Sequence, residues 1–235
     1  MYEAAFRTGD YAEAEAAFTG LLEQARASGD RALEAAALDR LGMLAHFRAL
    51  TPSGLTRITP VPAGSDRGQT VPEQARSEQA LFEQALEIRR ELDDKAGMAE
   101  SLFGLGLVHQ VLYEDWDTAI QCYRESLALA EQHGDLLLRS EVHRHIGFYH
   151  TAGDLQSDLA LHHLRISHEL RAELGDARWM PGGTMALGLA ELTDGLREQG
   201  LAHVREALQQ ARDARLSPER IAWIEHFLEE ASAEG

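Results

Sequence analysis

Three histidines within ten residues are the first feature of this sequence that could support chemistry. The stretch EVHRHIGFYH contains His143, His145 and His150. A metal site on one helix needs ligands three or four residues apart. His143 and His145 are two apart and lie about 200° apart around a helix, while His143 and His150 share a face but are separated by about 10 Å along it. The spacing therefore favours packing histidines over a single metal site.

A second arrangement of ligand-type residues runs across the chain. His109, His150 and Glu191 each stand four residues after a leucine or isoleucine that precedes a glycine. Two imidazoles and a carboxylate can bind a metal if neighbouring helices bring them together, but the first copy of the pattern has Ala45 at this place. A metal-dependent enzyme is therefore the least favoured reading. We expect no catalytic residue, no metal and no cofactor, because no HExxH, phosphate-binding loop or nucleophile elbow occurs.

The elements that carry these residues recur along the chain. The copies are marked by Leu41-Gly42, Leu105-Gly106, Ile146-Gly147 and Leu187-Gly188. An aspartate stands eleven residues before each pair: Asp30, Asp94, Asp135 and Asp176. The last two steps are 41 residues each, and the first is 64 and contains an insertion of 23. Each pair is followed by a second amphipathic run with helical spacing, so the sequence predicts an all-α stack of helix pairs.

These copies divide the chain into repeats within one predicted domain, 1–235. The expected divisions are a partial first repeat at 1–29, a second at 30–94 with a proline-rich insertion at about 50–74, a third at 95–135, a fourth at 136–176, a fifth at 177–215, and a capping helix and tail at 217–235. Ser217-Pro218 is a good helix start. Ile221, Ile224 and Leu228 then share one face, as a helix that closes a stack requires.

Composition limits the kinds of partner. The net charge of −17 argues against nucleic acid, whose binding needs a basic surface, and suits a basic protein or peptide. Cys122 is the only cysteine, which excludes an internal disulfide and makes the cytoplasm the expected location. No apolar run is long enough to span a membrane, and the first residues lack an export signal.

The repeats resemble the tetratricopeptide repeat (TPR) family. The resemblance rests on GDYAEAEAAF, on the leucine–glycine pairs, and on the spacing of Ala119, Tyr123 and Ser126. The long period is similar to that of kinesin light chains and of bacterial regulators with a TPR sensor region. The resemblance implies a right-handed α-solenoid whose first helices line a concave groove, and a non-catalytic scaffold that binds proteins.

The groove residues follow from this resemblance and from helical periodicity. We expect them to include Asp39, Met43, His46, Glu100, Phe103, Leu107, Gln110, Glu141, Arg144, Phe148, Thr151, Met185 and Leu189. Arg144 is the lone firm cation among them, so the clamp with which some family members bind a C-terminal carboxylate is not expected. The apolar members suit an amphipathic segment or an apolar small molecule.

Two irregularities bear on binding. The insertion from Leu50 to Gln74 is long enough to be a lid beside the groove or a mobile loop. Pro181 falls where the other copies are already helical, so that helix should start late or bend. Trp179 and Gly182 beside it are therefore additional binding candidates.

The leading prediction is a scaffold that binds a basic or amphipathic protein segment, with no nucleic acid and no membrane as partners; self-association is compatible with it. The alternative is a small-molecule-sensing TPR module that acts through a partner.

Overall fold

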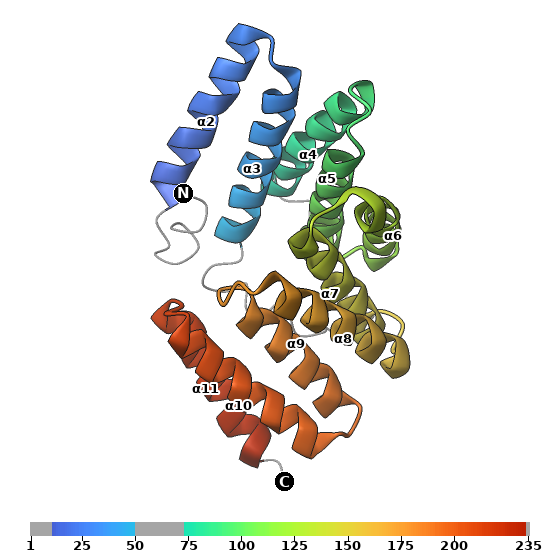
Figure 1. Cartoon of the computed structure of the whole chain (residues 1–235), viewed down its shortest axis with the longest axis vertical. Helices are drawn as coiled ribbons and strands as arrows, with labels where there is room; N and C mark the ends of the chain where they lie inside the picture. Colours follow the sequence, from blue (N-terminus) through green and yellow to red (C-terminus); the bar gives the residue numbers. More distant parts are fainter. Residues whose placement is uncertain (1–10, 50–72, 234–235) are drawn as a thin grey trace. The chain divides into compact units, whose positions relative to one another are not determined.

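The computed structural model describes residues 11–49 and 73–233, in which every regular element is helical (Figure 1). The chain divides into two compact units, Met1–Gly134 and Asp135–Gly235. The boundary falls at the end of the predicted third repeat. Predictions for 1–10 and for 50–72, including the partial first helix, the lid and the helix start at Thr70, lie outside the described residues.

In the N-terminal unit, successive helices pack as neighbours. They are α2 (Tyr11–Ser28), α3 (Arg31–Ala49), α4 (Glu73–Glu91), α5 (Lys95–Leu107) and α6 (Trp116–His133), with a π-helical turn η2 (Val108–Tyr113) continuing α5. The π turn breaks the 3.6-residue period on which the sequence analysis relied, so side chains beyond Leu107 are displaced around the axis.

In the C-terminal unit, α7 packs on α8 and α9 packs on α10. The bounds are α7 (Leu136–Ala152), α8 (Ser157–Leu174), α9 (Met180–Thr193), α10 (Arg197–Asp213) and α11 (Pro218–Ala233). Ile224 of α11 is buried, and Ile221, Trp223, Phe227 and Leu228 pack around it. The predicted closing helix and its apolar face are confirmed. The all-α helical repeat is likewise confirmed.

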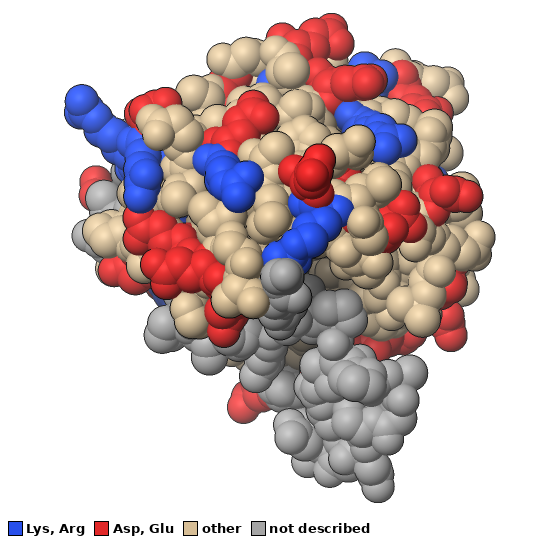
Figure 2. Space-filling view, turned by 90° about the horizontal axis from the view of Figure 1, so that it is seen from below, with Lys and Arg blue, Asp and Glu red and all other residues tan. Residues whose placement is uncertain are grey.

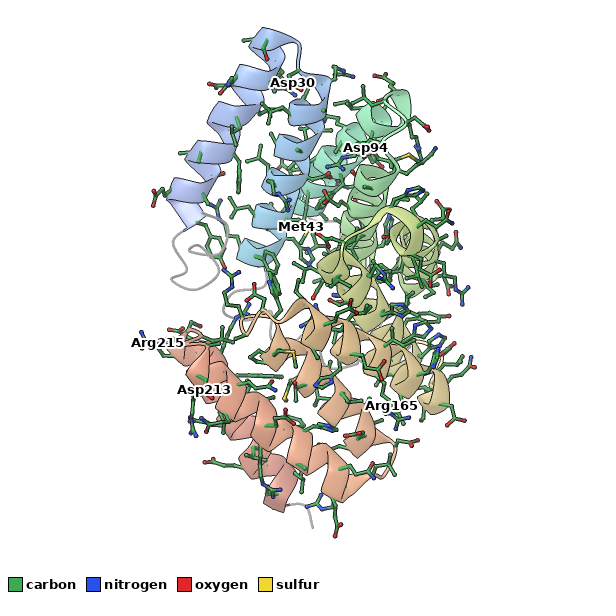
Figure 3. All side chains as sticks on the ribbon, viewed as in Figure 1. Asp30, Met43, Asp94, Arg165, Asp213 and Arg215 are labelled. Atoms are coloured by element: carbon green, nitrogen blue, oxygen red, sulfur yellow. The ribbon has the colours of Figure 1, made fainter. Side chains whose placement is uncertain are left out.

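The recurring aspartates start helices. Asp30, Asp94 and Asp135 each accept a hydrogen bond from the backbone N–H three residues on, at 2.8–3.0 Å. Figure 3 shows Asp30 and Asp94 at the starts of α3 and α5. Asp176 instead accepts from the nearby Arg178 N–H, because α9 begins only at Met180, with Pro181 in its first turn. The predicted late start of this helix is confirmed.

The recurring glycines let the two helices of a pair approach closely. A Cβ on Gly147 would lie 2.6 Å from Leu164 Cγ, and one on Gly106 would overlap the Tyr123 ring. Gly106 and Gly147 are 41 residues apart, as are Tyr123 and Leu164. The same contact is therefore repeated at the predicted period, with the glycine of one helix beneath a large side chain of the next.

Several turns place a residue in the left-handed region of the backbone. Glu114 (φ 55°) precedes α6, Leu155 (φ 56°) precedes α8, and Gly195 (φ 80°) precedes α10. Glu114 and Leu155 are again 41 residues apart. Leu155 is also 74% exposed, so neither packing nor conformational preference explains a leucine at this turn.

No helix in the described part of the chain is both long and apolar enough to cross a membrane. On the face drawn in Figure 2, acidic and basic side chains alternate, and the basic ones do not gather into a continuous patch there.

Candidate binding surface on the first helices of the repeats

The clearest candidate surface in the C-terminal unit lies on α7, where four predicted residues are half-buried. They are Glu141, Arg144, Phe148 and Thr151. Arg144 donates from Nη2 to Glu141 Oε2 at 2.6 Å and to His145 Nε2 at 3.0 Å. Its guanidinium carbon lies 5.1 Å from the centre of the Phe148 ring, a cation–π contact. One helix therefore presents a cation and an aromatic ring held against each other.

Arg171 of α8 anchors this surface from inside. The Arg171 side chain is 2% exposed and donates to Glu141 Oε1 and to the Trp179 carbonyl oxygen. Burial alone raises the pKa of Glu141, but Arg144 and Arg171 outweigh it and lower that pKa to about 2. Burial lowers the pKa of Arg171 to about 10, a value at which it stays charged. Glu141 is thus an ionised link between the surface arginine and the buried one.

A similar arrangement exists in the N-terminal unit around Arg89 of α4. Arg89 Nη2 lies 2.7 Å from Asp39 Oδ2 and 3.1 Å from Glu100 Oε2. Ser101 Oγ donates to Asp39 Oδ1 at 2.9 Å. Burial raises the pKa of Asp39 to about 7 although Arg89 and Ser101 act against it. Asp39, expected in the groove, is 4% exposed and links α3 to α4 and α5.

Sequence reasoning missed both arginines, although a signal was present. Arg89 and Arg171 are 82 residues apart, twice the repeat period, and each stands two residues before Glu-Leu. Glycines of the following helix leave space for them. A Cβ on Gly183 would lie 2.7 Å from Arg171 Cδ, and one on Gly97 would overlap the Arg89 guanidinium. An arginine at this register reaches the first helix of its own repeat and the start of the next.

A second buried ion pair joins α3 to α4. His46 Nδ1 lies 2.7 Å from Glu78 Oε1, with both side chains at most 2% exposed. Glu78 Oε2 has no hydrogen-bond partner among the described residues. His46 was expected on the groove, and its imidazole is instead directed toward α4.

The other predicted residues of the N-terminal unit lie mainly in its core. Phe103 and Leu107 are 5% and 4% exposed, and Met43 packs on the cluster around Phe82. Gln110, in the π turn, accepts a hydrogen bond at 2.6 Å from Tyr123 Oη of α6. These residues fix helix packing and leave little surface for a ligand.

The predicted residues of α9 also pack mainly inward. Met185 is buried against Val204 and Ile224, and Leu189 lies at the edge of that cluster. Gly182 is exposed, beside Arg171, and Trp179 precedes the helix and provides the carbonyl that Arg171 binds. The structure therefore leaves α7 as the helix of this unit with the most accessible predicted side chains.

The histidines of the C-terminal unit are paired by a residue that helix spacing alone did not identify. His163 of α8 lies against His143 of α7, with the two Nδ1 atoms 2.9 Å apart. The His163 ring also stacks on that of His150, 5.8 Å between centroids, and His150 Nδ1 lies 2.9 Å from Asp154 Oδ1. Burial, followed by the charges of His162 and Arg139, lowers the pKa of His143 to about 4.

The row of His109, His150 and Glu191 does not act as a set. His109 Nδ1 is 3.8 Å from Asp115 Oδ2, His150 binds Asp154, and Glu191 Oε2 lies 2.5 Å from His203 Nδ1. Within 11–49 and 73–233, no three histidine, cysteine or carboxylate side chains form a group suited to a metal ion.

Helix pairs with a repeated glycine-to-ring contact and a recurring buried arginine define the class: an α-helical repeat protein. Residues 79–132 match the family model for the tetratricopeptide repeat. With the same helix pairs on both sides of this match, the chain is a tetratricopeptide repeat protein. Repeats of this family generally mediate protein–protein interaction and are typically non-catalytic.

Solved structures share the fold at low sequence identity. BtubC (BKLC) from P. vanneervenii is similar with a TM-score of 0.55 and 16% identity, over 87% of this chain and 92% of that one. The MamA protein matches with a TM-score of 0.44 and 14% identity, over 85% and 93%. None of the curated proteins is similar in sequence.

Proposed function

We propose that the chain is a non-catalytic scaffold that binds a segment of a protein partner along the first helices of its repeats, with α7 as a principal contact. The observation that carries this proposal is the Arg144–Phe148 pair, half-buried on α7 and fixed from inside through Glu141 and Arg171. Arginine and aromatic side chains that are already ordered before binding are characteristic of interaction hot spots, because little entropy is lost when the partner arrives.

The chemistry of this surface suits an amphipathic segment. Phe148 offers an apolar contact, and Arg144 and Thr151 offer polar groups beside it. The net charge of −17 favours a segment with basic residues around its apolar ones, since these are attracted to the surrounding acidic surface. A cytoplasmic partner fits the single cysteine.

The test is affinity capture with matched variants. Phe148→Ala and Arg144→Gln remove the two members of the pair, and Leu159→Ala changes a leucine of α8 that is 40% exposed. Circular dichroism first confirms equal helicity. Proteins captured by the wild type and by Leu159→Ala should be lost from both α7 variants. An unchanged set of captured proteins with all three would refute the proposal.

A small-molecule-sensing module is the second candidate, and one observation favours it. A pocket of about 400 Å³ lies between the end of α9 and α11, lined by Leu192, Gly195, Arg197, Phe227, Glu230 and Ala231. This size is within the range of ligand sites, and its lining combines apolar and charged groups. A saturable rise in melting temperature with one class of metabolite, lost in Phe227→Ala, would support sensing. Uniformly unchanged melting across the library would argue against it.

A further inference from the structure

The contact between His143 and His163 has a property that ordinary core packing lacks. With the two Nδ1 atoms 2.9 Å apart, one ring must donate a proton and the other must accept it. The contact therefore exists when the pair is neutral or carries one extra proton. When both rings are fully protonated, two N–H groups face each other and the hydrogen bond is lost.

The surroundings of the pair oppose added positive charge. His143 is 6% exposed. The charges that act on it are Arg139 of its own helix and His162 of α8, and both are cationic in acid. The nearest carboxylate on this side, Asp154, is already bound to His150. On α9, which also packs against α7, Glu191 is engaged by His203 of α10.

We propose that the His143–His163 contact is an acid-sensitive latch, which holds α7 against α8 at neutral pH and weakens as the pH falls below about 6. The latch joins the two helices at one register, with His150 stacked on the other side of His163. It is a property of the unit Asp135–Gly235 and does not depend on what α7 binds.

The direction and size of the effect follow from linkage. Burial lowers the folded-state pKa of His143 to about 4, below the unfolded value of 6.5. The stabilisation is thus fully present above pH 6.5 and is lost as the pH falls toward 4. With these two values, opening of the contact should become about 30-fold more favourable between pH 7.5 and pH 5.0.

Hydrogen exchange of the backbone amides tests the latch on the full chain. After correction for the intrinsic pH dependence of exchange, amides of α7 and α8 should lose about 30-fold protection between pH 7.5 and pH 5.0 in the wild type. Amides of α10 should change much less and act as an internal reference. Equal pH dependence in all three helices would overturn the proposal.

Variants assign the effect to the pair. His143→Gln keeps a neutral hydrogen-bonding group at every pH, so acid should cost its α7–α8 protection far less than in the wild type. His163→Gln tests the same contact from α8 if the first variant folds poorly. His226→Gln changes a histidine whose side chain is 69% exposed on α11 and should behave as the wild type. An undiminished acid response in both pair variants would contradict the latch.

Discussion

Arg89 and Arg171 place guanidinium groups inside the helical layers, where the loss of hydration must be offset by carboxylates. Asp39 and Glu100 do this for the first, and Glu141 for the second. The sequence analysis took these three acids for groove residues, because a helical period gives the side of a helix and not what faces it. Whether a charge is buried depends on partners from other helices, and one sequence does not show those.

Removing the charge of Glu141 should expose its role. Glu141→Gln leaves Arg171 without its anionic partner, so the free energy of unfolding at pH 7 should fall by about 2–3 kcal/mol. The folded pKa of about 2 lies below the ordinary 4.5, so this stabilisation is present above pH 4.5 and lost as the pH falls toward 2. Urea unfolding of both proteins at pH 7 and pH 3 measures it. Equal stability at pH 7 would show that the link contributes nothing.

The turn residue Leu155 makes an opposite prediction. Its left-handed backbone costs a leucine about 1–2 kcal/mol, and its exposed side chain gains little in return. Leu155→Gly should therefore raise the melting temperature, with a net gain of about 0.5–1 kcal/mol after the greater freedom of glycine in the unfolded chain. The matched change Gly195→Ala, also at positive φ, should lower it. Calorimetry on both variants decides, and a loss in Leu155→Gly would mean that the leucine makes a contact of its own.

At the scale of helices, the repeat was well predicted because its packing contacts recur. Gly106 and Gly147 lie under Tyr123 and Leu164 at the 41-residue spacing, and Pro181 delays α9 as expected. The π turn after Leu107 was not predicted, because an inserted residue changes the register without leaving a pattern in the sequence. That turn directs Gln110 to Tyr123.

Two glycine substitutions test whether the buried arginine depends on space left by the next helix. Gly97→Ala would place a methyl group on the Arg89 guanidinium and should destabilise the protein by about 1–3 kcal/mol. Gly20→Ala in α2 meets no atom within 4 Å and should stabilise it by about 0.5–1 kcal/mol. Thermal unfolding compares the two. A neutral Gly97→Ala would mean that Arg89 can move aside without loss.

At the scale of the whole molecule, the chain is a tetratricopeptide repeat protein built from two compact units that meet at the end of the third predicted repeat. Its fold was predictable because the same small and large residues return at a fixed period. Its partner was not, because the repeated residues are packing residues and the surface residues differ from copy to copy. The account therefore rests on α7, where surface and buried charges are linked.

Site-specific photocrosslinking tests that central claim most directly. A photoreactive amino acid replaces Thr151 on the candidate surface in one variant and Leu159 on α8 in another, and each protein is irradiated in its native cells. The account predicts one protein partner crosslinked from position 151, absent from position 159, and lost when Phe148→Ala is added. Crosslinking of the same proteins from both positions, or from 159 alone, would contradict it.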